Sequence, residues 1–151
     1  MIKKEFLEVS GNIFIMMGCK QYKKKFVYEH EDMYITFMLS KSSFSEAYYH
    51  DFNCTIKVLH PGIKPSEITD KDFDFFAHPR LILAPKMVPL ELDKVDVNEY
   101  KKLLQNKLEG FLKGVDEKGL MLIKDYEKKG ELLNKNAQDL LRTVFGNSSH
   151  A

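Results

Sequence analysis

The chain has 151 residues, of which 44% are hydrophobic and 30% charged, and its 23 basic and 22 acidic residues leave a net charge of +1. This length suits one domain, and the ordinary globular composition excludes an intrinsically disordered chain. The balanced charge gives no overall field that favours nucleic acid or an anionic membrane. No stretch reaches the roughly 18–20 apolar residues of a transmembrane helix. We therefore predict a cytoplasmic protein with one globular domain over residues 1–146 and a flexible tail over 147–151.

Apolar residues at helical spacing open the sequence. Five of them follow one another at intervals of three or four residues: Ile2, Phe6, Val9, Ile13 and Met16. This is the spacing of an amphipathic helix that packs along one face. Gly18 is well placed to end the helix in a left-handed conformation, so we predict a helix over residues 2–17.

The next segments predict an antiparallel sheet. Residues 24–29 and 33–39 are short and β-rich, with a polar turn between them, which is typical of a hairpin. Residues 48–59 alternate between apolar and polar side chains and predict a third strand with one packed face and one solvated face. The N-terminal helix is expected to cover the packed face, which makes the fold α+β.

The middle of the sequence gives weaker patterns. Residues 63–79 are predicted to be irregular, with one helical turn around residues 70–76. Residues 80–92 look extended, but Pro85 and Pro89 cannot donate hydrogen bonds to a sheet, so this segment is expected at an edge.

Helices are predicted to close the chain. Asp96 is a typical N-cap, and Glu99 stands three residues later as in a capping box. An apolar stripe then predicts a helix over residues 97–114. Two shorter helices are predicted over residues 119–129 and 137–145, the last one followed by Gly146.

The two cysteines, Cys19 and Cys54, are predicted to be reduced thiols. Cys54 lies among alternating apolar residues, where a free cysteine behaves as a small hydrophobic side chain. The Gly-Cys pair at Cys19 follows an apolar run and could also be a lipoprotein processing site. Glu5 and Glu8 and the shortness of that run favour the helix instead. With no clear secretory signal, a disulfide is not expected.

The first part of the chain contains a recognisable succession of segments. A helix ends in Met17-Gly18-Cys19-Lys20 and is followed by KKKFVYE, MYITFMLSKSSFS and YYHDFNCTIKVLHP. This succession resembles a bacterial family described as a domain of unknown function, number four-three-zero-four. The family has a Leu-Gly-Phe-Lys-like helix end, a hairpin, a Gln-Lys-Ser-like segment and a Tyr-rich third strand.

The match to that family is closest in its middle region and extends over about the first 60 residues. Lys41-Ser42-Ser43 and Tyr48-Tyr49 match the family pattern. Cys19 stands where the family usually has an aromatic residue, and Leu39-Ser40 replaces the usual Gln position. The resemblance implies a fold of this type, and it implies no established activity and no catalytic residues.

The candidates for a catalytic site are weak. His50 could act as a general base beside Tyr49 and Asp51, with His78 as a further member of the site. Neighbours on a strand point to opposite faces, however, so Asp51 cannot easily orient His50. We therefore favour a His50 that lies on the packed face with its ring hydrogen-bonded. The histidines and cysteines show no zinc-binding spacing, so neither a metal nor a cofactor is expected.

A run of lysines from Lys20 to Lys25 is the first candidate binding surface. Lys20 and the consecutive Lys23, Lys24 and Lys25 alternate with the aromatic residues Tyr22, Phe26 and Tyr28, and such a patch can contact phosphates and stack bases. The alternative is that these lysines protect an edge strand from pairing with other chains, and we favour it.

The polar face of the sheet is the second candidate binding surface. It carries Tyr34, Tyr49, Asp51 and Asn53, and tyrosine and asparagine on a rigid surface suit the recognition of another protein. The alternative is a solvated face or one that a later helix covers.

These observations favour a non-enzymatic binding or regulatory protein, as immunity proteins are, with another protein as its expected partner. One alternative is a hydrolase or transferase with a site around His50. Another is a nucleic-acid binder that uses the Lys20–Lys25 patch.

Overall fold

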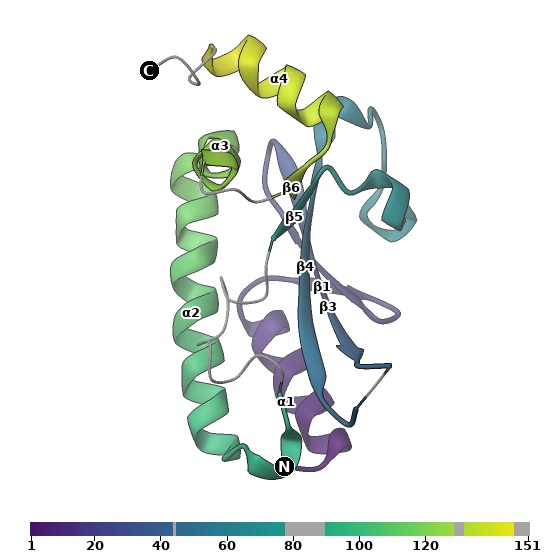
Figure 1. Ribbon diagram of the computed structural model, residues 1–151, viewed down its shortest axis with the longest axis vertical. Coiled ribbons are helices and arrows are strands. Elements are labelled where there is room, and N and C mark those ends of the chain that lie inside the picture. Colours follow the sequence, from purple (N-terminus) through teal and green to yellow (C-terminus); the bar gives the residue numbers. More distant parts are fainter. Residues whose placement is uncertain (44, 78–89, 129–131, 147–151) are drawn as a thin grey trace.

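A six-stranded antiparallel sheet forms the centre of the protein (Figure 1). The computed structural model describes residues 1–43, 45–77, 90–128 and 132–146. The strands lie in the sheet in the same order as in the chain, so each strand pairs with its sequence neighbour. Helix α1 (Lys3–Met16) precedes the sheet, and three further helices lie in the C-terminal half. This arrangement confirms the predicted α+β fold. The predicted tail lies outside the described residues.

The sheet contains more strands than the sequence pattern predicts. They are β1 (Lys20–Tyr22), β2 (Lys25–Glu29), β3 (Met33–Lys41), β4 (Tyr48–Ile56), β5 (Phe75–Ala77) and β6 (Leu132–Leu133). The predicted hairpin is β2–β3, and its pairing joins Phe26 to Phe37. The third strand ends at Ile56, because residues 57–59 turn into a 3-10 helix instead of continuing the strand to residue 59.

The segment between β4 and β5 is more ordered than predicted. It contains short 3-10 turns at Pro65–Glu67 and Asp70–Asp72. The helical turn expected around residues 70–76 is therefore limited to the second of these, and β5 follows it. Most of the predicted edge strand over residues 80–92 lies outside the described residues, but Leu90 forms an isolated antiparallel bridge with Tyr48.

The helices begin and end close to the predicted boundaries. Gly18 follows α1 with φ +100°, in the left-handed region that favours glycine. Helix α2 (Val97–Lys118) begins at Asp96, whose side chain accepts a hydrogen bond from the Glu99 N–H at 2.9 Å. It runs past the predicted end at residue 114, because Val115 still packs in the core. Helices α3 (Leu120–Lys128) and α4 (Lys135–Phe145) complete the chain.

The main hydrophobic core lies between the sheet and the helices α1 and α2. Phe14 of α1 stacks on Phe37 of β3 with ring centroids 5.1 Å apart. Phe111 of α2 packs edge-on against Phe52 of β4 at 4.4 Å. Such aromatic pairs add to the stabilisation from apolar burial. The predicted covering of the apolar face by the N-terminal helix is confirmed, and α2 shares that face.

A second, smaller cluster lies on the opposite face of the sheet. Val27 of β2 and Tyr34 of β3 pack there against Ile68 and Phe73, and all four side chains are buried. The last two belong to the segment of residues 57–74, which crosses this face. The outer face of the sheet is therefore partly covered by a loop with 3-10 turns, whereas helices cover the inner face.

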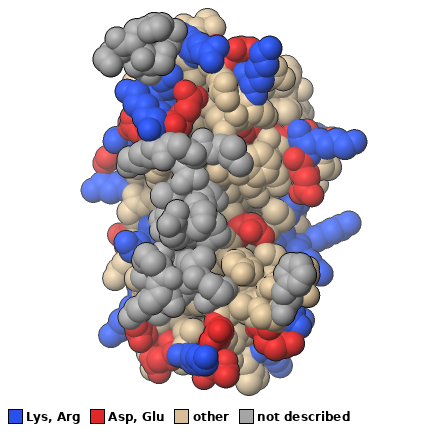
Figure 2. Space-filling model, in the orientation of Figure 1, with Lys and Arg blue, Asp and Glu red and all other residues tan. Residues whose placement is uncertain are grey.

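Charged side chains of both signs are mixed over the surface that Figure 2 shows, and neither sign dominates this view. This agrees with the net charge of +1. Any electrostatic recognition must therefore come from local groups of side chains.

Candidate binding sites

His50 lies on the helix-covered face of β4 and is only 2% exposed. Its Nε2 is 2.7 Å from the Tyr100 hydroxyl of α2, and that hydroxyl is 2.6 Å from Oγ of Ser10 in α1. The rings of Phe6 and Phe14 meet the imidazole edge-on. The expectation that His50 is a hydrogen-bonded residue of the packed face is confirmed.

Burial fixes the protonation state of this network. It lowers the pKa of His50 to about 3 and raises the pKa of Tyr100. The imidazole is therefore neutral at physiological pH, and its Nδ1 has no partner among the described residues. A general base must reach a substrate proton, whereas this ring is enclosed between the sheet and two helices. The geometry gives His50 a structural role, which is to join α1, α2 and β4.

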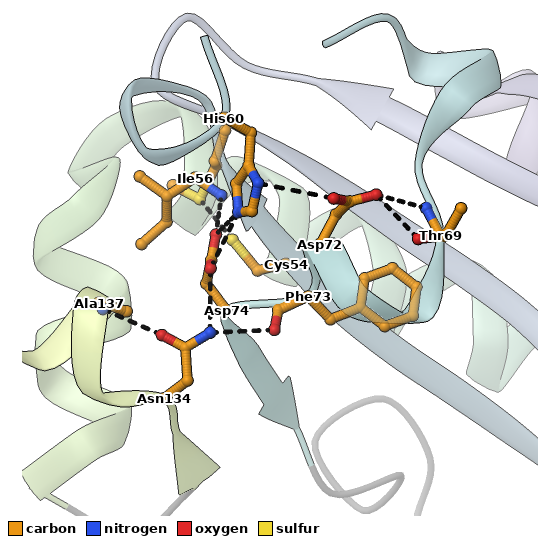
Figure 3. A network of polar contacts seen from close by, with 10 residues as sticks. Cys54, Ile56, His60, Thr69, Asp72, Phe73, Asp74, Asn134 and Ala137 are labelled. Atoms are coloured by element: carbon orange, nitrogen blue, oxygen red, sulfur yellow. Dashed lines mark hydrogen bonds and ion pairs between the residues drawn. The ribbon is translucent and has the colours of Figure 1, made fainter.

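A buried carboxylate organises the other end of the sheet (Figure 3). Asp74 is 2% exposed, and its side chain accepts hydrogen bonds from the Ile56 N–H at 2.7 Å, from His60 Nε2 at 3.0 Å and from Asn134 Nδ2 at 3.0 Å. A buried charge is stable only when it is paired and hydrogen-bonded in this way. Asp74 thus joins β4, the 57–74 segment and the start of α4.

The His60–Asp74 pair resembles part of a catalytic arrangement but lacks the chemistry for one. His60 Nδ1 lies 3.6 Å from Oδ1 of Asp72, while its Nε2 faces Asp74. Both ring nitrogens are therefore turned to carboxylates, and neither remains to take a proton from a nucleophile. The arrangement anchors the outer loop. Nothing in the local sequence marks these residues, because their partners come from distant segments.

Both cysteines are free and buried, as predicted. Burial raises the pKa of Cys19 to about 12 and raises that of Cys54 well above its usual range. Neither thiol has the thiolate character of a reactive cysteine.

One compact group of potential metal ligands occurs among the described residues. It consists of His30, Glu31 and Asp32 in the β2–β3 turn, whose ligand atoms lie within 4.8 Å of one another. His30 Nδ1 already accepts a hydrogen bond from the Asp32 N–H at 3.1 Å. The lone pair of His30 Nδ1 therefore already stabilises the turn. The cluster of His30, Glu31 and Asp32 by itself does not define a metal site.

The predicted polar face of the sheet is largely covered. Tyr34 and Asn53 are 6% and 7% exposed, and the Tyr34 hydroxyl donates a hydrogen bond to the Ile63 carbonyl at 3.3 Å. Tyr49 and Asp51 are half-buried. The 57–74 segment causes this burial, and the sequence pattern of the strands alone cannot reveal it.

A shallow opening remains where this cover ends. This outer cleft has a volume of about 480 Å³ and is lined by Met38, Asp51, Phe52, Asn53, Asp70, Phe73 and Phe76. The Phe76 side chain on β5 is 41% exposed and meets the ring of Phe73 edge-on at 6.1 Å. The cleft contains two of the residues predicted for protein recognition, Asp51 and Asn53. It also contains Asp70 and Phe76, which sequence reasoning missed.

The lysines of the predicted patch point to different parts of the surface. The Lys25 ammonium donates a hydrogen bond to the Ile68 carbonyl on the outer face. Lys23 and Lys24 form the tip of the β1–β2 hairpin instead, because Tyr22 pairs with Lys25. The three lysines therefore do not form one surface.

A pocket lies between the start of α1 and the β1–β2 hairpin. This hairpin pocket has a volume of about 390 Å³ and is lined by Lys3, Leu7, Gln21, Lys23, Lys24, Phe26, Leu39, Lys41 and Tyr48. Phe26 and Tyr48 are buried and form apolar walls, whereas the lysines are exposed. Lys3 and Lys41 come from segments far from the hairpin, so the run of lysines in the sequence identifies only half of the cationic group.

The backbone at Lys23 is strained. Its φ of +57° makes it the only non-glycine residue with positive φ among those described. Two-residue hairpin turns favour glycine, asparagine or aspartate at such positions, and a lysine there costs about 1–2 kcal/mol. The Gln21 side chain donates to the Lys23 carbonyl at 2.9 Å and holds the turn. Strain of this kind concentrates at functional sites.

Comparison of the chain with protein-family models, with curated proteins and with solved structures finds no match. The resemblance to the family of unknown function therefore stays a prediction. None of the described helices is both long enough and apolar enough to cross a membrane.

Proposed function

We propose that this chain is a non-enzymatic binding or regulatory protein that recognises another protein through the outer cleft. The observation that supports this most is the exposed ring of Phe76 beside the carboxylates of Asp51 and Asp70. Exposed aromatic side chains in a partly desolvated depression are typical anchors of protein interfaces. The cleft is open and shallow, which suits a protruding segment of a partner better than an enclosed small molecule.

The charges of the cleft indicate the chemistry of the partner. Its lining contains two carboxylates and no lysine or arginine. Asp51 Oδ2 accepts a hydrogen bond from Ser40 Oγ at 2.6 Å, and its other oxygen has no partner among the described residues. A partner segment that carries an arginine or lysine next to an apolar side chain would complement this surface.

The cleft is built on a rigid support. Phe76 lies on β5, which pairs with β4 through Asn53. The wall that carries Asp70 is a capped turn in which Thr69 and Asp72 hydrogen-bond each other. Asp74 lies between this turn and β5, and its hydrogen bonds to Ile56, His60 and Asn134 hold both in place. A preformed surface of this kind loses little conformational freedom on binding, which supports recognition.

The alternatives receive less support from the placement of their residues. A hydrolase or transferase around His50 would need an accessible base, and His50 is enclosed in the core. His78, the other histidine of that hypothesis, lies outside the described residues. A nucleic-acid surface along Lys20–Lys25 would lose Lys25, which bonds to Ile68 on the other face.

Selection of a phage-displayed random peptide library on the intact protein tests this proposal. We expect enrichment of peptides that combine a basic and an aromatic or aliphatic residue. Binding of an enriched peptide is expected to weaken about tenfold in Phe76→Ala, and similarly in Asp51→Asn combined with Asp70→Asn.

The matched control is Val58→Ala, which removes another exposed apolar side chain that is not part of the cleft lining. Enriched peptides that bind Phe76→Ala and Val58→Ala equally well would contradict the proposal. A library without any enriched sequence, at a protein concentration that detects micromolar binding, would do the same.

A further inference from the structure

The hairpin pocket combines a group of lysines with an apolar lining. Four lysines surround its mouth, namely Lys3, Lys23, Lys24 and Lys41, and no acidic residue lines it. Its walls are apolar and come from Leu7, Phe26, Leu39 and Tyr48. Lysines beside an apolar depression favour a ligand with a negative head and an apolar body.

The lysines are available for such a ligand. Lys41 is paired with the exposed Glu46 at 3.2 Å, an ion pair that solvent screens. Lys3, Lys23 and Lys24 have no ion pair with any residue of the described segments. Uncompensated cations that converge on one mouth raise the local concentration of anions.

We propose that the hairpin pocket binds a small phosphate monoester with an apolar body. The mouth contains lysines and no arginine. Each lysine ammonium acts as a point charge with three donors. Several lysines can therefore share one phosphate monoester, which offers three terminal oxygens and up to two negative charges, whereas a carboxylate offers two oxygens and one charge. The volume of about 390 Å³ falls at the low end of the usual range for small-molecule pockets.

The backbone at Lys23 gives independent support. A glycine at φ +57° would relieve the turn, yet the position holds a lysine whose side chain lines the pocket. Lys23 and its neighbour Lys24 both line the pocket from the tip of the hairpin. A purely structural hairpin does not need a lysine at this position, whereas an anion site gains a positive charge.

This site is separate from the outer cleft. Lys23 and Lys24 line the hairpin pocket on the side of α1, whereas Asp51 and Asp70 line the outer cleft on the opposite face of the sheet. The proposal therefore does not depend on the proposed protein recognition, and either can fail alone.

Calorimetric titration of the full chain with four probes tests the proposal. The probes are n-decyl phosphate, inorganic phosphate, decan-1-ol and decanoate. The two ionic amphiphiles are kept below their critical micelle concentrations, and decan-1-ol is kept below its solubility limit. We expect decyl phosphate to bind at least about tenfold more tightly than inorganic phosphate or decanol, because only it satisfies both the lysines and the apolar walls. Decanoate is expected to bind more weakly than decyl phosphate, which separates the two anionic head groups.

Variants locate the binding. Lys24→Gln and Lys23→Gly are each expected to weaken decyl phosphate binding about five- to tenfold. Lys20→Gln is the matched control, since Lys20 is an exposed lysine of the same hairpin that does not line the pocket. Lys23→Gly is informative because it removes the ammonium at a position where glycine is expected to favour the turn. Its thermal stability, measured beside the binding, separates a loss of binding from a loss of folding.

Three results would overturn the proposal. Decyl phosphate and decanol could bind equally well, which would leave no role for the lysines. Lys20→Gln could weaken binding as much as Lys24→Gln, which would indicate general charge attraction. A single-stranded oligonucleotide could displace decyl phosphate at equal phosphate concentration, which would assign the lysines to a nucleic-acid backbone.

Discussion

The two faces of the sheet differ in how they are covered and in what they leave open. The inner face is closed by α1 and α2, and its aromatic residues pack in one continuous core. The outer face is crossed by the 57–74 segment, which buries a cluster of only four residues. The outer cover also leaves the hydroxyls of Thr36 and Thr55 buried without a partner among the described residues. The inner face therefore contributes most of the folding free energy. The outer face contributes less, because it buries fewer apolar side chains and leaves buried hydroxyls unpaired, and part of it stays accessible.

Truncation of one phenylalanine on each face gives the largest expected contrast. Phe37→Ala on the inner face is expected to lower the free energy of unfolding by about 3–5 kcal/mol, because Phe37 is 1% exposed within the large core. Phe73→Ala on the outer face is expected to cost about 2 kcal/mol, since a smaller cluster can collapse around the cavity. Urea denaturation measures both. Equal losses would show that the outer cluster is as well packed as the inner core.

Removal of the Asp74 carboxylate tests what holds the outer cover in place. Asp74→Ala is expected to lower the free energy of unfolding by about 3 kcal/mol, because it leaves the buried Ile56 N–H without its acceptor. Asp72→Ala, whose side chain is 22% exposed, is expected to cost about 1 kcal/mol. Thermal or urea unfolding of the two variants provides the comparison. A smaller loss for Asp74→Ala than for Asp72→Ala would assign the anchoring to the exposed turn.

Acid sensitivity is expected to come from the inner face. His50 has a folded-state pKa of about 3, so between pH 6.5 and 3 the unfolded chain binds a proton that the folded chain does not. Stability is therefore lost as the pH falls through this window, by about 2–3 kcal/mol between pH 6.5 and 4.5 from this group. His50→Phe removes the proton uptake, and its unfolding free energy is expected to fall less over the same range. Identical pH profiles for the two proteins would contradict the assignment.

The smallest expected effect concerns the hairpin. Lys23→Gly is expected to raise the free energy of unfolding by about 0.5–1 kcal/mol, because relief of the positive φ exceeds the entropy that glycine adds to the unfolded chain. Lys24→Gly, at a position without positive φ, is expected to lower it by about 0.5–1 kcal/mol. A thermal shift assay compares the two variants. A destabilised Lys23→Gly would show that the turn has no strain to release.

The contrast between the faces also explains what the sequence could predict. The helix stripes of α1 and α2 and the alternation in β3 and β4 are local patterns, so these elements and the inner core follow from them. Strands β1 and β5 have three residues each, and such short segments become strands only because a neighbouring strand offers its hydrogen-bonding edge. The cover over Tyr34 and Asn53 depends on a loop, and loops give no periodic signal.

The candidate sites were predictable only in fragments. Lys23 and Lys24 are visible as a run in the sequence, but Lys3, Lys41 and the apolar walls join them through the packing of α1 on the sheet. Asp51 and Asn53 are visible as polar residues of a strand, whereas Phe76 joins them through the pairing of β5 with β4. The partner of His50 is Tyr100, which lies 50 positions away, and no local pattern could identify it.

The order of the strands has a consequence for how the chain is made. Each strand pairs with the one before it, so a chain that leaves the ribosome N-terminus first can complete β1 to β4 and dock α1 early. The inner face then remains half bare until α2 has been synthesised, because Tyr100, Leu104, Leu108 and Phe111 come from that later helix. During this interval the nascent sheet exposes aromatic surface. When α2 docks, the Tyr100 hydroxyl hydrogen-bonds to Ser10 of α1 and to His50 of β4, and the aromatic surface of the inner face becomes buried.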